Sequence, residues 1–459
     1  MFTLVFKSTS VTSLTCIVST TVVTLWIVYQ YRERKHRHRR RRRIPSKCHL
    51  ELHSAYEKLI GCTPLIRLDV LSELLDRSIY VKMESLNPGG TGKDRAALCM
   101  IQQKESIGEL PPPKKSLEDS SFLATSTANS QEYDCDEGDM PSESLSLEYL
   151  TFVLRLAMKK SESGGLVIEG TSGSTGISLA TLCAARGHAC VVVLPDDQAP
   201  EKKTILKALG ATVLVVPTAS ISNPQHYVNI ARRLALMARS DLGIQAVFLD
   251  QFENLANGKV HFNCTGPEIY RDCPQLDAFV MSAGTGGTIA GVASYLKEQK
   301  PSVKIILVDP PGSALYHAVQ HGIVYAPQQK EQSIRRHRYD TIAEGIGLDR
   351  WTANLREGKE FLDKAIQVTD QDAVDMAHYL LRTEGLWVGS SSAMNVVGAI
   401  KTASELPPGA TVVSVICDSG QRHVTRFWNQ SFIEEWGLVW PGDKKAYLPE
   451  CLINFHFKK

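Results

Sequence analysis

The sequence predicts an α/β fold in which a parallel sheet carries helices on both faces. Short runs rich in Val and Ile recur along the chain, and stretches with helical spacing separate them. This alternation is typical of parallel strands joined by crossover helices. Strands are expected at 164–170, 188–195, 210–217, 276–282, 303–309 and 409–417, with helices such as 176–187 and 287–300 between them. Ligands bind at the carboxyl ends of such strands, so the strand-to-helix loops are the expected functional segments.

The first 47 residues are expected to lie outside this fold. Residues 8–31 carry no charged side chain, and a stretch of that length can cross a bilayer as a helix. Residues 32–43 follow with nine Arg or Lys and one Glu, a net charge of +8. By the positive-inside rule, the rest of the chain then faces the cytosol. A single-pass anchor is favoured over a secretory signal, whose charge precedes the apolar stretch, and over an arginine-rich matrix transit peptide.

Residues 48–459 are expected to form one globular domain. The whole chain has a net charge of +2, so the part outside the basic block carries −6, which argues against a nucleic-acid partner. Eleven cysteines occur without a C-x-x-C pair, and no metal site is indicated. Residues 111–163 are expected to form a largely disordered acidic insertion closed by a helical stretch. Between residues 116 and 144 this segment has eight acidic side chains and no basic one.

A lone lysine follows the first apolar run of this domain. The segment "ESLNPGGTGKDRAALCM" breaks regular structure at Pro-Gly-Gly and then resumes helical spacing. Lys93 is therefore expected at the start of a helix, where the helix dipole disfavours a cation. A surface lysine beside a turn is the simple interpretation, unless another part of the chain requires an amine there.

Two later loops suggest anion sites. The segment Ala283–Gly291, "AGTGGTIAG", follows an expected strand and opens a helix, an arrangement that suits a phosphate. It matches neither the triphosphate nor the dinucleotide motif, and a tight turn is the alternative. The segment Ile168–Ala180 places Thr171, Ser172, Ser174 and Thr175 at a helix start. Simple N-capping needs one hydroxyl rather than four, so a carboxylate or phosphate ligand is indicated.

A lysine, a phosphate loop and a carboxylate loop in one α/β domain fit pyridoxal phosphate chemistry on an amino acid. The lysine would form the Schiff base, the glycine loop would bind the 5′-phosphate, and the hydroxyl loop would bind the α-carboxylate.

The motifs resemble the cysteine synthase and cystathionine β-synthase family of fold-type II pyridoxal-phosphate enzymes. The segment 87–95 is similar to the family's "N-P-x-x-S-x-K-D-R" lysine motif, and 284–288 matches its "G-T-G-G-T" phosphate loop. "TSGSTG" is similar to its "T-S-G-N-T-G" substrate loop. Four further segments follow the family's order: "GCTPLIRL", the segment from Gln251, "EGIG" at 344–347 and "DSGQR" at 418–422. The resemblance implies the two-lobed parallel-sheet fold of tryptophan-synthase-β-like enzymes.

The resemblance also implies a cofactor and a reaction. Cysteine synthases convert O-acetyl-L-serine and sulfide into L-cysteine and acetate through an α-aminoacrylate on pyridoxal 5′-phosphate. Lys93 would be the catalytic base, and Ser419 would face the pyridine nitrogen. The implied cofactor-binding residues are Lys93, Ser174, Gly284, Thr285, Gly286, Gly287, Thr288 and Ser419. The implied substrate-binding residues are Thr171, Ser172, Ser174, Thr175, Gln251 and Gly345.

Several positions depart from the family pattern. Ser174 stands where the family usually has asparagine, Gly92 loosens the lysine loop, and Cys417 stands where proline is common. The physiological substrate is therefore open. Cystathionine β-synthase activity, cysteine desulfhydrase activity and a catalytically weak, membrane-tethered binding protein are the alternatives.

The anchor and insertion resemble those of fungal mitochondrial outer-membrane cysteine synthase-like proteins. The resemblance implies a homodimer in the mitochondrial outer membrane with its catalytic domain in the cytosol, and the ER membrane is the alternative. No nucleic-acid partner is expected.

Overall fold

The computed structural model describes residues 54–113, 146–325, 341–442 and 449–456. Residues 50–459 form one compact unit. The expected membrane span at 8–31, the basic block and most of the acidic insertion lie outside the described residues. Within the ranges given above, no helix is both long enough and apolar enough to cross a membrane.

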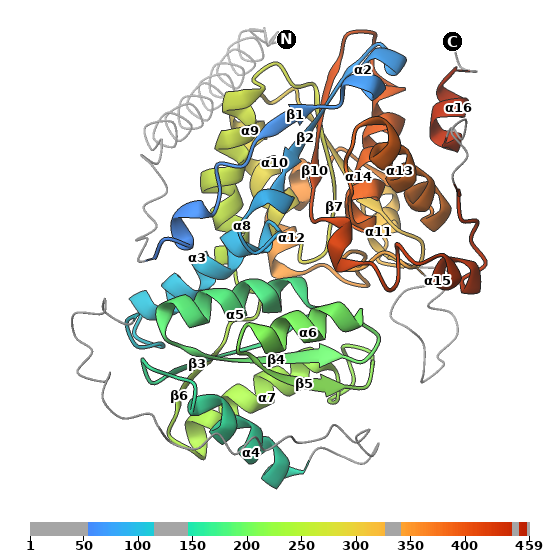
Figure 1. Cartoon of the computed structure of the whole chain (residues 1–459). Coiled ribbons are helices and arrows are strands. Elements are labelled where there is room, and N and C mark those ends of the chain that lie inside the picture. Colours follow the sequence, from blue (N-terminus) through green and yellow to red (C-terminus); the bar gives the residue numbers. More distant parts are fainter. Residues whose placement is uncertain (1–53, 114–145, 326–340, 443–448, 457–459) are drawn as a thin grey trace, which may run out of the picture. The chain divides into compact units, whose positions relative to one another are not determined.

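Ten strands are found in the described part of the chain, and they form two sheets (Figure 1). Their bounds are β1 (Leu65–Arg67), β2 (Ser78–Met83), β3 (Gly165–Gly170), β4 (Ala189–Pro195), β5 (Thr212–Val216), β6 (Gln245–Phe248), β7 (Ala278–Ser282), β8 (Lys304–Asp309), β9 (Lys364–Gln367) and β10 (Thr411–Ile416). The larger sheet has the order β1-β2-β10-β7-β8-β9 and is parallel except for β1. The smaller sheet has the order β5-β4-β3-β6 and is wholly parallel.

Helices connect most of these strands. The α-helices are α2 (Asp69–Leu75), α3 (Lys93–Ser106), α4 (Leu147–Met158), α5 (Ser174–Arg186), α6 (Pro200–Ala208), α7 (Tyr227–Ser240), α8 (Ala256–Val260), α9 (Gly266–Asp272), α10 (Gly287–Gln299), α11 (Leu315–His321), α12 (Ala353–Gly358), α13 (Asp370–Thr383), α14 (Ser390–Ala403), α15 (Gln430–Glu435) and α16 (Glu450–His456). The shorter turns are η1 (Glu57–Leu59), η2 (Glu84–Leu86), the π-helical η4 (His261–Thr265), η6 (Lys359–Phe361) and η7 (Gly420–Arg422).

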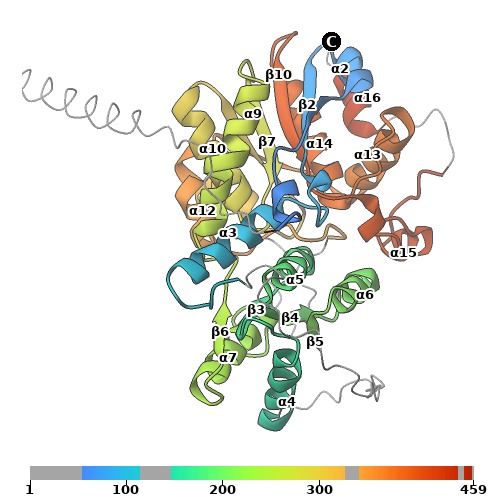
Figure 2. The same ribbon diagram turned by 60° about the vertical axis from the view of Figure 1, so that its left-hand side comes forward.

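The larger sheet is covered on both faces, because its strand side chains alternate between two cores. Phe279 and Ile305 point into a core shared with α9 and α10, whereas Val280 and Ile306 point into a core shared with α13 and α14. Figure 2 shows α9, α10 and α12 on one side of this sheet and α13 and α14 on the other. Strands buried on both faces read as continuous apolar runs, which is why the sequence predicts β7, β8 and β10.

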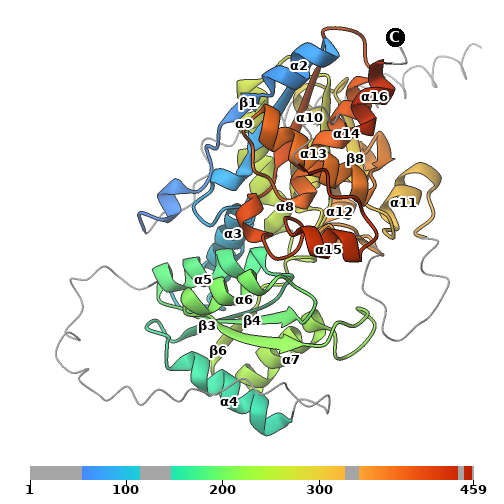
Figure 3. The same cartoon turned by 45° about the vertical axis from the view of Figure 1, so that its right-hand side comes forward.

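The smaller sheet is covered in the same way (Figure 3). Ile168 and Val191 pack with α4 and α7, and Val167 and Val192 pack with α3, α5 and α6. Helix α4 lies in the part of the sequence assigned to the insertion, and its side chains Leu150, Val153, Leu154 and Ala157 are buried. This end of the 111–163 segment therefore belongs to the core of the smaller lobe.

The predicted α/β class and parallel sheets are confirmed, and the six expected strands correspond to β3, β4, β5, β7, β8 and β10. Strands β1, β6 and β9 are not among the predicted runs. They have only three or four residues and include polar or charged side chains, so their pairing depends on the neighbouring strand rather than on a local apolar run.

Candidate active site

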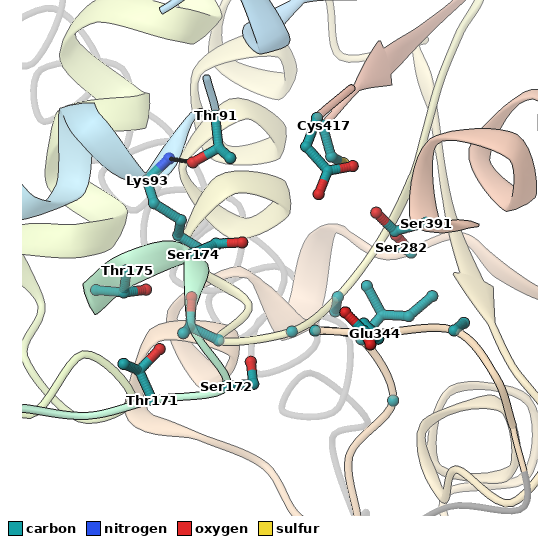
Figure 4. Close-up of a pocket in the computed structure, with 18 of the residues that line it drawn as sticks. Thr91, Lys93, Thr171, Ser172, Ser174, Thr175, Ser282, Glu344, Ser391 and Cys417 are labelled. Atoms are coloured by element: carbon teal, nitrogen blue, oxygen red, sulfur yellow. Dashed lines mark hydrogen bonds between the residues drawn. The ribbon is translucent and has the colours of Figure 1, made fainter. Parts of the chain in front are cut away.

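A cavity lies at the carboxyl ends of parallel strands from both sheets. Its walls come from the segments that follow β2, β3, β4, β6, β7 and β10, together with the 341–348 segment. The cavity has about 1520 Å³ of empty space when the part open to solvent is counted, so a cofactor and a small substrate have room there. Figure 4 shows Lys93 and the hydroxyls of 171–175 on one side of this cavity, with Cys417, Ser391 and Ser282 on the other.

Lys93 is the first residue of α3 and lines the cavity. Gly92 precedes it without a side-chain cap, and the Lys93 backbone N–H donates to Thr91 Oγ1 at 3.0 Å. Burial lowers the pKa of the Lys93 ammonium from its usual value, which outweighs the opposing effect of Cys417, Asp418 and Glu84. The lysine expected at a helix start is thus a cavity amine with a weakened hold on its proton.

A buried ion cluster fixes the loop that carries Lys93. The Arg95 guanidinium donates to both oxygens of Glu84 at 2.8 Å and to Glu268 on α9 at 2.7 and 2.8 Å. Lys82 on β2 lies 2.7 Å from the same Glu268 carboxylate. Burial opposes ionisation of Glu84, but Arg95 lowers its pKa to about 2. Sequence reasoning missed Glu84 and Glu268 in this role, because Glu268 lies 173 residues from Arg95.

The hydroxyl loop lies on the same side of the cavity as the lysine (Figure 4). Gly173, at φ +121°, precedes α5, and its N–H donates to Thr171 Oγ1 at 3.1 Å. Thr175 donates to Gln251 Oε1 at 2.6 Å, and Gln251 Nε2 donates to the Gly170 carbonyl at 3.0 Å. Ser172 and Ser174 are partly exposed and line the cavity. The structure therefore brings five of the predicted substrate residues to one wall: Thr171, Ser172, Ser174, Thr175 and Gln251.

The glycine loop forms the floor beside this wall. Gly286, at φ +83°, precedes α10 without capping it by a side chain. The Gly287 N–H donates to Thr285 Oγ1 at 3.4 Å, and the other N–H groups of the first turn have no acceptor within the helix. A Cβ added at Gly284 would lie 2.1 Å from the Gly345 carbonyl oxygen, and only glycine fits this approach. Asn257 donates to Thr285 Oγ1 at 2.8 Å and to the Gln251 carbonyl at 2.9 Å, so one side chain links the glycine loop to the segment that carries Gln251. No motif in the sequence singles out Asn257.

The segment after β10 differs in detail from the expectation. Cys417 and Asp418 line the cavity, whereas Ser419 is not among the described residues that line it. The Ser419 hydroxyl accepts from the Gln421 backbone N–H at 3.3 Å, as a cap of η7. Burial raises the pKa of the Cys417 thiol to about 11, so the thiol is protonated near neutral pH. Gly287 is also absent from the described lining, although it begins α10.

Comparison with known proteins gives the same assignment as the motifs. The model of the "Pyridoxal-phosphate dependent enzyme" family matches residues 56–127 and 143–418. "Cysteine synthase 2" of Schizosaccharomyces pombe is 40% identical over 85% of this chain and 87% of its own. The "Putative mitochondrial cysteine synthase" of Saccharomyces cerevisiae is 42% identical over 82% of this chain and 84% of its own.

The chain belongs to the cysteine synthase and cystathionine β-synthase family of pyridoxal-phosphate-dependent enzymes. A solved structure of the family, an O-acetylserine dependent cystathionine β-synthase from Helicobacter pylori, aligns with a TM-score of 0.59. It is 26% identical and covers 82% of this chain and 98% of its own. Membership of this family identifies the cofactor as pyridoxal 5′-phosphate.

The cavity of this pyridoxal-phosphate enzyme fits that cofactor. The uncapped start of α10 and the close-packed Gly284 form a cradle for a phosphate. The buried Ser282 hydroxyl lines the cavity and has no hydrogen-bond partner among the described residues, so it is open to a ligand atom. Lys93 provides the amine. Metal-ligand clusters of three or more His, Cys, Asp or Glu are not found in the described ranges.

The buried side chain of His423 should make the free energy of unfolding of this enzyme depend on pH. Burial disfavours the charged form of His423, but Asp418 at 2.9 Å and Glu344 at 3.4 Å raise its pKa to about 9. Arg422, Arg426 and Lys202 are the cations of the same cluster. A raised pKa stabilises the fold fully below the unfolded value near 6.5, and this contribution is lost as the pH rises through about 9.

We therefore expect the free energy of unfolding to fall by about 3 kcal/mol between pH 6.5 and pH 9 because of His423. Urea unfolding of wild type and His423→Gln across this range measures the effect. The variant should lose most of the slope. Parallel curves for the two proteins would show that His423 is not the group responsible.

Proposed function

We propose that this enzyme is a cysteine synthase that converts O-acetyl-L-serine and sulfide into L-cysteine and acetate. The observation that carries the proposal is the presence of Lys93, a phosphate cradle and a loop of hydroxyls in one cavity. Relatives that are named cysteine synthases and are 40% and 42% identical over most of the chain support it. In this reaction the Cβ–O bond to acetate breaks, and a Cβ–S bond to sulfide forms.

Each segment that lines the cavity has a separate role in the proposed reaction. Pyridoxal phosphate, when bound, withdraws electrons from the amino-acid Cα and so acidifies its proton. The Lys93 amine would hold the cofactor in the resting enzyme. Once the substrate amine has displaced it, the free amine, whose pKa burial lowers, would accept that proton. The hydroxyls and N–H groups of 171–175, with Gln251 behind them, bind the α-carboxylate. The start of α10 binds the phosphate.

Product analysis tests this proposal. The purified residues 48–459, loaded with pyridoxal phosphate, are given O-acetylserine with sulfide and, separately, serine with homocysteine. We expect cysteine to form in the first mixture much faster than cystathionine forms in the second. Faster cystathionine formation would favour the cystathionine β-synthase alternative, for which the 26% identical Helicobacter pylori structure is the precedent. Sulfide release from cysteine would favour a desulfhydrase, and no turnover at all would favour a binding protein.

The variant Ser174→Asn tests whether the 171–175 loop limits the use of O-acetylserine. An asparagine side chain has two donors and longer reach, whereas a serine hydroxyl has one donor. A weakened hydrogen bond to a charged group costs about 1–3 kcal/mol. We expect Ser174→Asn to raise kcat/KM for O-acetylserine by about tenfold, since 1.4 kcal/mol is a factor of ten. Steady-state kinetics measures this. An unchanged or lower kcat/KM would indicate that Thr171, Thr175 or a water already fills this position.

We also propose that residues 8–31 anchor the enzyme in the mitochondrial outer membrane, with residues 48–459 in the cytosol. The uncharged stretch and the +8 block support an anchor, and the name of the Saccharomyces cerevisiae relative supports the organelle. Protease added to intact mitochondria should remove the catalytic domain while a matrix marker survives. Full protection would reverse the orientation, and cofractionation with ER markers would favour that membrane.

A further inference from the structure

A chain of buried ionic groups crosses one wall of the cavity. The Lys202 ammonium on α6 forms an ion pair with Glu344, and Glu344 lies 3.4 Å from His423, which in turn lies 2.9 Å from Asp418. All four side chains line the cavity. Lys202 comes from the smaller lobe, whereas the other three come from segments that pack on the larger sheet. The ion chain therefore joins the two lobes at the substrate cavity.

Lys202 also contacts the backbone of the hydroxyl loop. Its Nζ donates to the Ser172 carbonyl at 3.2 Å, and a Cβ added at Gly173 would lie 2.5 Å from Lys202 Cδ. The residue is 2% exposed. Its methylenes thus pack against the loop at its glycine, while its ammonium joins the loop to Glu344. The hydroxyls of Ser172 and Ser174 flank this point of attachment.

A contribution to the stability of the fold does not by itself explain this row of buried ionic side chains. A buried ion pair has to overcome the desolvation of both charges and often stabilises a fold no more than apolar residues of similar size would. Glu344 is nonetheless held ionised: burial opposes its charge, but Lys202 and His423 keep its pKa well below the usual range. Its backbone N–H also donates to Ser390 Oγ on α14 at 3.2 Å, which fixes its position. A fixed carboxylate is suited to orient the ammonium that contacts the loop.

We propose that Lys202 is a positioning residue for the α-carboxylate site: held by Glu344, it fixes the Ser172–Gly173 backbone in the conformation that presents the loop hydroxyls to the substrate. The proposal rests on the proposed function of the loop, and it adds a residue outside the loop on which substrate affinity depends. Lys202 need not touch the substrate.

A neighbouring residue provides a matched control. Glu201 on the same helix accepts from the Thr425 N–H at 2.7 Å and from its hydroxyl at 2.6 Å, and so also bridges the two lobes. Glu201 is not among the described residues that line the cavity. If the two contacts only held the lobes together, loss of the Lys202 contact and loss of the Glu201 contact would change substrate affinity equally. If the loop position matters, only Lys202 would change substrate affinity.

The experiment compares Lys202→Met, Lys202→Arg, Glu344→Gln and Glu201→Gln as holoenzymes with wild type. L-Alanine, which has no β-leaving group, is titrated while the absorbance of the bound cofactor is followed. This binding measurement needs no cysteine synthesis, so it stays informative if the enzyme has another reaction. KM and kcat for O-acetylserine are measured in parallel.

We expect Lys202→Met and Glu344→Gln each to raise the alanine Kd and the O-acetylserine KM by about tenfold, with kcat changed less than about threefold. Lys202→Arg should recover most of the affinity, and Glu201→Gln should match wild type. The double variant Lys202→Met with Glu344→Gln should be no weaker than either single variant, because the two side chains act as one unit. Unchanged binding in Lys202→Met, or equal weakening in Glu201→Gln, would overturn the proposal. If Lys202→Met does not fold, an unchanged Kd in Glu344→Gln overturns it equally.

Discussion

Replacing Lys93 with alanine is expected to lower the rate of cysteine formation by at least about a thousandfold, because we propose that this one amine both holds the cofactor and, when freed from it, moves the Cα proton. The amine lies in the cavity, where burial lowers its pKa and so makes its neutral form easier to reach than that of an exposed lysine. The visible absorbance band of the bound cofactor should also shift or disappear. Absorbance spectra and initial rates at saturating O-acetylserine measure the two effects.

Lys104→Ala is the control for this variant. Lys104 lies on the same helix, α3, and pairs with the partly exposed Glu109 at 2.8 Å. Exposed pairs contribute about 0–1 kcal/mol, so activity and absorbance should stay as in wild type. A Lys93→Ala protein that keeps its absorbance band and its rate would place the cofactor elsewhere.

The second large effect is expected at Gly284. An alanine Cβ there would lie 2.1 Å from the Gly345 carbonyl oxygen, so the backbone of one of the two loops must move. Overpacking of this kind costs about 1–3 kcal/mol, and it would displace the N–H groups that we propose bind the phosphate. We expect Gly284→Ala to weaken pyridoxal phosphate binding by about a hundredfold, measured by titrating cofactor-free protein.

Gly108→Ala is the matched control, because a Cβ at Gly108 meets nothing within 4 Å. Its φ of +75° makes that substitution slightly strained, but the site lies after α3 and outside the described cavity lining. Equal cofactor affinity in the two alanine variants would mean that the Gly284 cradle does not bind the phosphate.

The sequence predicts those parts of the site whose structure is determined by residues close together in the sequence. Lys93, the 171–175 loop and the 284–288 loop are recognisable because each combines a strand end, a tight turn and a helix start within a few positions. Their convergence at one cavity follows from the parallel sheets, whose strand ends share an edge.

Long-range partners were not predictable in the same way. Lys202 and Glu344 are 142 residues apart, and Arg95 and Glu268 are 173 apart. Neither pair shows a local pattern, because their contacts arise only when the lobes and helices pack. The role of Ser419 stays a prediction: the "DSGQR" motif points to a segment in which Cys417 and Asp418 line the described cavity, and Ser419 follows them directly.

Borohydride reduction of the holoenzyme, followed by proteolysis and mass spectrometry, identifies the lysine that holds the cofactor. Reduction fixes the pyridoxyl group on its amine, and the mass of each lysine peptide then shows where it lies. We predict that the modified peptide contains Lys93 and that Lys202, the other lysine of the described cavity lining, is unmodified. A pyridoxyl group on Lys202 or on any lysine outside the cavity, with Lys93 free, would contradict the assignment of this site.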